Sequence, residues 1–135
     1  MVDFKIAATK PKYAVRVGKV LSKSPAASGF STALVYRPDL PEEQRHGSLY
    51  FVIDIGSASP LAPDIAYNLI DIIKEEYYRN LLVGPSQSFE NALKAANEEF
   101  AAIAKEGEKD WIGKTNITIA AIAGDKLMAV HRGTN

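Results

Sequence analysis

An aspartate ends an apolar run in the stretch FVIDIGSASP, residues 51–60. A carboxylate at a strand end, followed by a loop of small residues, can ligate a hard metal ion such as Mg²⁺ or Mn²⁺. The same arrangement also lets Asp54 cap a turn by accepting hydrogen bonds from backbone N–H groups, with no metal present. Both interpretations stay open at this point, and we favour the second.

The other residue types used in catalysis are poorly placed. His46 falls in a polar loop and His131 near the end of the last expected strand, and neither has a serine in a strand–turn–helix elbow to activate. The segment WIGKT is similar to the end of a phosphate-binding P-loop. However, five residues rather than four separate Gly107 from Gly113, and the segment follows a helix instead of preceding one. The chain has no cysteine, which excludes disulfides, thiolate zinc sites and cysteine nucleophiles.

Length and composition indicate one ordinary globular domain spanning residues 1–135. Lys+Arg and Asp+Glu both total 16, so a formal charge of zero offers no field for nucleic acid or an anionic membrane surface. The N-terminus lacks an apolar segment of signal-peptide length, and no apolar run is long enough to cross a bilayer. Because the absence of cysteine also fits a reducing compartment, we expect a cytoplasmic location.

Strand periodicity appears at both ends of the chain. Five strands are expected: Tyr13–Leu21, Phe30–Arg37, Leu49–Asp54, Asn116–Ala123 and Lys126–Arg132. The third is almost wholly apolar, which predicts a strand covered on both faces. The segment PDLPEEQRHG, residues 38–47, is expected to be a polar loop, and Gly124-Asp125 suits a tight hairpin between the last two strands.

Two long amphipathic helices are expected in the middle of the chain. In the first, between Pro60 and Asn80, apolar residues recur at helical spacing: Ile65, Leu69, Ile72 or Ile73, and Tyr77. The second is expected to begin at a capping serine, Ser86 or Ser88, and to end at Gly107. Its apolar seam comprises Phe89, Leu93, Ala96, Phe100 and Ile103. This element order predicts an α+β fold in which helices cover one face of an antiparallel sheet.

Four features follow one another from about Leu49 to the end of the sequence. An apolar strand ends at an aspartate, two long helices follow, GKTNITIAAIA opens a strand, and a hairpin leads to a strand ending HRGTN. This order resembles the N-terminal half of a PP2C-type (PPM) protein serine/threonine phosphatase, in which the corresponding motifs read D-G-x-G-G, G-T-T and V-G-D-S-R. The resemblance implies a PP2C-like β-sandwich, or half of one, whose antiparallel sheet is covered by two long antiparallel helices.

Members of that family bind a pair of Mg²⁺ or Mn²⁺ ions that activate a water for attack on a phosphate. The resemblance assigns Asp54 as a metal ligand, together with the backbone carbonyl of Ile55, which replaces a glycine of the motif. The family's early acidic pair should fall near residues 27–32, which read ASGFST and contain no carboxylate. G-T-T has become Gly113-Lys114-Thr115, and G-D-S has become Gly133-Thr134-Asn135. One carboxylate is too few for a site that holds two hard cations.

We therefore expect a catalytically inactive PP2C-like domain, a pseudophosphatase, that acts as a regulatory or protein-binding module and needs no cofactor. One alternative is an active Mg²⁺- or Mn²⁺-dependent phosphatase whose remaining ligands lie in a further C-terminal half. Another is a self-associating structural domain, since half of a two-sheet sandwich would leave an apolar sheet face for a second copy to cover.

Overall fold

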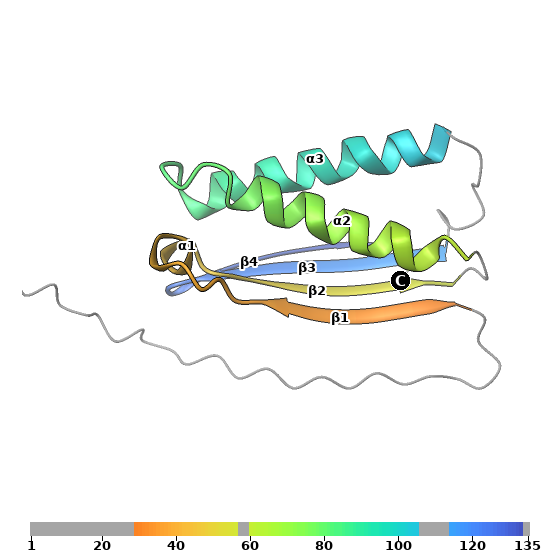
Figure 1. Cartoon of the computed structure of the whole chain (residues 1–135), viewed down its shortest axis with the longest axis horizontal. Helices are drawn as coiled ribbons and strands as arrows, with labels where there is room; N and C mark the ends of the chain where they lie inside the picture. The colour runs from red at the N-terminus through yellow and green to blue at the C-terminus, as the bar shows by residue number, and fades with distance from the viewer. Residues whose placement is uncertain (1–28, 57–59, 106–113, 134–135) are drawn as a thin grey trace, which may run out of the picture.

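The computed structural model describes residues 29–56, 60–105 and 114–133, which form a sheet with helices on one side (Figure 1). The elements in chain order are β1 (Phe30–Tyr36), α1 (Pro41–His46), β2 (Ser48–Ile55), α2 (Ala62–Tyr77), α3 (Pro85–Lys105), β3 (Thr115–Ala123) and β4 (Lys126–Arg132). The four strands pair antiparallel in the order β1-β2-β3-β4. The predicted α+β class is confirmed. The PP2C-like sandwich remains a prediction.

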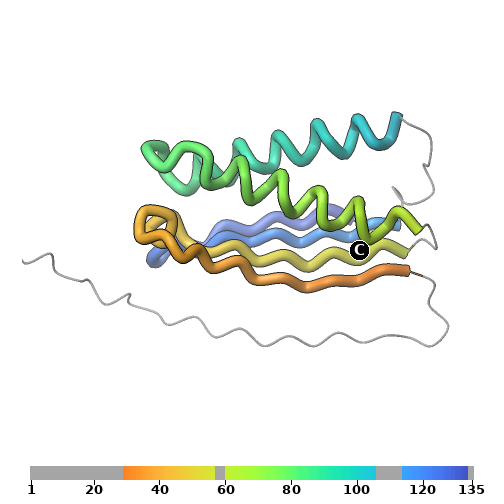
Figure 2. Tube along the Cα trace, in the orientation of Figure 1, coloured from red at the N-terminus to blue at the C-terminus, as the bar shows by residue number. Residues whose placement is uncertain are grey.

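The long helices form the second layer of the molecule. Figure 2 shows the chain leaving β2, running back and forth through α2 and α3, and returning to the sheet as β3. α2 packs against α3 and against β1 and β2. The apolar spacing predicted for the first helix is confirmed, because Ile65, Leu69, Ile73 and Tyr77 are all buried. Ile72, the alternative to Ile73, is only half-buried.

β2 shows how the sheet divides its two faces. Leu49, Phe51, Ile53 and Ile55 point toward the helices and are buried. Val52, between them, is 51% exposed, and Asp54 is exposed as well. The prediction that this strand is covered on both faces is therefore wrong for the described residues. The apolar run was misleading because successive strand residues point to opposite faces, and no described element covers the second one.

α3 begins at Pro85, before either serine proposed as its cap. Ser88 is an interior residue of the helix and is buried, whereas Ser86 is exposed. Proline favours the first helical position, because its fixed φ suits the helix and its missing N–H would have had no intrahelical partner there. In the predicted seam, Phe89 and Phe100 are buried, and Leu93, Ala96 and Ile103 pack against the core. The expected end at Gly107 lies outside the described residues.

The predicted loop at residues 38–47 contains a helix, α1, so this prediction is wrong. Pro41 stands in its first turn with Glu42 and Glu43, while Arg45 and His46 stand in its last turn. This distribution complements the helix dipole and favours a short helix despite the polar composition. Gly47 ends it with φ of 97°. A Cβ on Gly47 would lie 2.8 Å from the Ala123 Cα, so both conformation and space require glycine here.

The expected strand Tyr13–Leu21 lies outside the described residues, so its pairing is untested. Within the residues that the structure describes, no helix is both long and apolar enough to cross a membrane.

Candidate functional site

Asp54 stands on the side of the sheet that faces away from α2 and α3. Its Oδ1 accepts a hydrogen bond from the Ser31 Oγ at 2.6 Å, across the β1–β2 pair. On its other side Asp54 pairs with Asn116 of β3. The carboxylate is thus engaged with a hydroxyl group of the neighbouring strand. The sequence placed Asp54 correctly near a strand end but did not identify Ser31 as its partner.

Ile55 continues β2 in regular strand pairing. Its side chain is fully buried in the core. Its carbonyl oxygen lies against Gly29, where an added Cβ would approach it to 2.8 Å. The following residue, Gly56, donates its N–H to the Lys114 carbonyl at 2.9 Å, which extends the pairing with β3. The segment from Asp54 to Gly56 is therefore held on both sides by strands.

In the described part of the chain, Asp54 and the Ile55 carbonyl are not joined by a group of further metal ligands. Among residues 29–56, 60–105 and 114–133, no three His, Cys, Asp or Glu side chains come together in a group that could hold a metal ion. Of the positions aligned with the phosphatase motifs, Gly113, Thr134 and Asn135 lie outside the described residues. Thr115 is buried, and Lys114 is exposed.

The surface around Asp54 is mostly apolar, and we call it the open sheet face. The strand registers place eight apolar side chains on it: Ala33, Val35, Tyr50, Val52, Ala120, Ile122, Leu127 and Ala129. Leu127 is 67% exposed. Polar groups stand at one end of this face. There the Thr118 Oγ1 lies 2.8 Å from the His131 Nδ1, and Thr118 pairs with Val52, two residues before Asp54 on β2.

His46 is the residue that sequence reasoning misplaced. Only 4% of it is exposed, and its Nε2 lies 2.7 Å from the Ser88 Oγ. The Tyr77 ring lies 5.0 Å from the imidazole, centroid to centroid. Burial lowers the pKa of His46, which favours the neutral ring. Since Ser88 is only 1% exposed, this Ser–His pair cannot reach a substrate and acts as a structural link between α1 and α3.

Two tyrosines complete the link at the end of α1. Tyr77 Oη donates to the His46 carbonyl at 2.6 Å, and Tyr78 Oη donates to the Gly47 carbonyl at 2.7 Å. Burial raises the pKa of Tyr77 to about 12 and also raises that of Tyr78. Both hydroxyls therefore stay protonated donors, which satisfy carbonyl groups at the end of a short helix.

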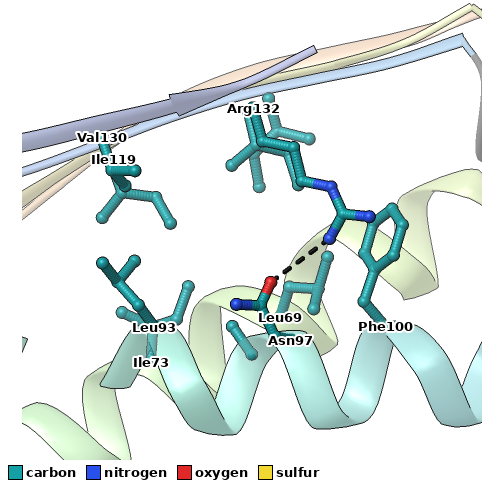
Figure 3. A pocket seen from close by; sticks show the side chains of 11 residues that line it. Leu69, Ile73, Leu93, Asn97, Phe100, Ile119, Val130 and Arg132 are labelled. Carbon is teal, nitrogen blue, oxygen red and sulfur yellow. Dashed lines mark hydrogen bonds between the residues drawn. The ribbon is translucent and has the colours of Figure 1, made fainter. Parts of the chain in front are cut away.

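A cavity of about 100 Å³ lies between α3 and the β3–β4 side of the sheet (Figure 3). Its walls are almost wholly apolar: Ile53, Leu69, Ile73, Leu93, Ala96, Phe100, Ile117, Ile119 and Val130, with Asn97 and Arg132 as the polar exceptions. Arg132 Nη1 donates to the Asn97 Oδ1 at 3.2 Å, and its guanidinium carbon lies 4.2 Å from the centre of the Phe100 ring. The sequence placed the apolar positions in strands or on helix seams and Arg132 at the end of a strand, and it did not identify Asn97.

Comparisons of the chain with models of protein families, with curated proteins and with solved structures found no match.

Proposed function

We propose that this chain is a PP2C-like domain that binds protein through its open sheet face and does not hydrolyse phosphoesters. The observation that carries the proposal is the state of Asp54, whose carboxylate is hydrogen-bonded to Ser31 on an apolar sheet surface.

Metal-dependent phosphate chemistry needs a different environment. Paired Mg²⁺ or Mn²⁺ ions require several oxygen ligands, mostly carboxylates, directed at one point. The described neighbours of Asp54 in the sheet are Ser31 and Asn116 across the strands, and Val52 along β2 on the same face. Serine, asparagine and valine leave the charge of two divalent ions uncompensated. The hydrogen bond from Ser31 explains the position of Asp54 without a metal ion, because it links the paired ends of β1 and β2.

The open sheet face supports the binding part of the proposal. Val52 and Leu127, on β2 and β4, are more than half exposed, although β-branched and leucine side chains gain free energy on burial. Apolar sheet faces usually pack against a second layer about 10 Å away. Asp54, near the end of β2, is the one Asp, Glu, Lys or Arg among the described strand positions of this face, so two copies could stack with their apolar parts together and without strong like-charge repulsion. The occupant that we propose is a second copy of this chain, related by a two-fold axis.

The test is the molar mass of the purified full chain in solution, measured by light scattering over a wide range of concentrations. We expect a monomer–dimer equilibrium. Val52→Lys and Leu127→Lys should shift it to monomer, because each buries a charge in the interface. Leu82→Lys is the matched control, since Leu82 is 97% exposed in the α2–α3 connection, away from this face, and should leave the equilibrium unchanged.

A monomer at every concentration would overturn the proposed self-association, and so would a dimer that both lysine variants leave intact. Hydrolysis of an aryl phosphate in the presence of Mn²⁺, lost in Asp54→Ala, would overturn the non-catalytic assignment. The two parts of the proposal therefore fail by different measurements.

A further inference from the structure

The cavity beneath α3 is a gap in the packing of the two layers. Leu93 and Phe100 project from α3 toward the sheet, where Ile119 and Val130 face them from β3 and β4 (Figure 3). Ala96 of α3 lines the same cavity. Protein interiors are normally filled nearly as densely as organic crystals, so a space of about 100 Å³, partly open to solvent, leaves these side chains short of contacts. A ligand of the right shape would restore them.

The size of the cavity limits what can enter. An apolar engineered cavity of about 150 Å³ stays dry and binds benzene. The somewhat smaller space here suits one aromatic ring or a short alkyl chain with modest adjustment of its walls. Among the described residues that line it, only Asn97 and Arg132 offer polar side chains, so water inside would lack most of its hydrogen-bond partners.

Arg132 is the charged residue that lines the cavity. Arg132 is an exposed residue, yet its side chain lines the cavity, so its guanidinium is accessible both to solvent and to a bound molecule. One donor is used by Asn97, and the face of the group rests on Phe100. No carboxylate of the described residues forms an ion pair with it. A guanidinium has five N–H donors in a planar fork that matches a carboxylate, so several donors remain for an anion.

We propose that this cavity binds a small amphipathic carboxylate, with an aromatic ring or short alkyl chain between α3 and the sheet and the carboxylate on Arg132. This site lies on the helix side of the sheet and is independent of the open sheet face. Charge complementarity selects the anionic group, and the apolar walls select the rest of the ligand.

The experiment uses benzoate as the probe, benzamide as its neutral analogue and methyl NMR signals of Ile119 and Val130 as reporters. Benzoate should give saturable shifts at these methyl groups, and benzamide should bind at least about tenfold more weakly. Arg132→Gln should weaken benzoate by at least about tenfold and benzamide much less, because only the anion loses an ion pair with the guanidinium as well as a hydrogen bond. Lys126→Gln is the matched control, since it removes an exposed cation from the same strand outside the cavity.

Filling the cavity gives a second, independent arm. Ala96→Leu should abolish benzoate binding without lowering the melting temperature, whereas Ala101→Leu, on the exposed side of α3, should change neither. Three results would each overturn the proposal: no saturable shift with benzoate, equal benzoate affinity in Arg132→Gln, or undiminished binding in Ala96→Leu. The Arg132 variant alters an exposed residue, so its test does not depend on whether the filled variant folds.

Discussion

The Ser88 hydroxyl and the His46 imidazole meet at 2.7 Å inside the protein, although 42 residues separate them in the chain. His46 comes from the end of α1 and Ser88 from the first turns of α3, so the bond fixes a polar, proline-rich segment to the helical layer. The pair resembles catalytic machinery in residue type only. Because both side chains are buried, the His46–Ser88 hydrogen bond stabilises the fold and has no access to a substrate.

Replacing Ser88 should therefore destabilise the fold. Ser88→Ala leaves the His46 Nε2 buried without this partner, and a buried polar group that loses its partner costs about 1–3 kcal/mol. The free energy of unfolding from urea titration measures the effect. Ser86→Ala is the matched control, because Ser86 is exposed two residues earlier in the same helix, and should stay within about 0.5 kcal/mol of the parent. Equal effects of the two substitutions would contradict a structural role for the His46–Ser88 bond.

The lowered pKa of His46 predicts a pH dependence of stability. The unfolded chain binds a proton at His46 near its ordinary value of about 6.5, while the folded protein resists protonation until lower pH. The unfolded state therefore holds more protons in this window, and stability should be fully present above about pH 6.5 and fall as the solution is acidified below it.

Urea midpoints measured between neutral and mildly acidic pH would test this sign. His46→Gln should flatten the slope, because glutamine does not titrate. His131→Gln, which removes the exposed imidazole on the open sheet face, should retain it. If stability instead rose on acidification, or if both variants kept the parental slope, the account of a neutral, buried His46 would be wrong.

Gly47 should tolerate no side chain. Its φ of 97° is unfavourable for other residues, and a Cβ would press on Ile122 and Ala123 of β3. We expect Gly47→Ala to cost about 1–3 kcal/mol from conformation alone and more from the steric clash. Gly84 offers the comparison, since a Cβ there meets nothing within 4 Å. Equal melting temperatures of Gly47→Ala and Gly84→Ala would contradict the requirement for glycine at position 47.

Much of the fold could be predicted from the sequence because the relevant signals are local. Alternation in Phe30–Arg37 and Asn116–Ala123, and the recurrence of Ile65, Leu69, Ile73 and Tyr77, report directly on which side chains share a face. The helix α1 was missed because its polar composition hides the end preferences of Pro41 and Arg45, which identify it only when helix termini are considered.

The sites could not be predicted, because they depend on contacts between distant residues. Ser31 and Asp54 are 23 residues apart, and only the register of β1 on β2 places them together. Arg132 reaches Phe100 and Asn97 because β4 returns beneath α3. The sequence shows neither the register nor the size of the gap between the layers. The mostly apolar composition of β2 did not indicate that Val52 and Asp54 lie on the face of the sheet opposite the helices.

The Ser31–Asp54 bond can be measured by a double-mutant cycle. Ser31→Ala and Asp54→Ala should each lower the free energy of unfolding by about 0.5–1 kcal/mol, at the modest end for an exposed hydrogen bond. The double variant should lose clearly less stability than the two single variants lose together, because either substitution alone already removes the same hydrogen bond. Strict additivity would show that the two side chains act independently.

Whether Asp54 binds a metal ion can be measured by a calorimetric titration of the full chain with MnCl₂, repeated on Asp54→Ala. If Asp54 serves the sheet through Ser31, neither protein should release saturable heat, and the substitution should affect stability alone. Saturable heat in the parent protein that disappears in Asp54→Ala would contradict the account, since the carboxylate would then belong to a metal site.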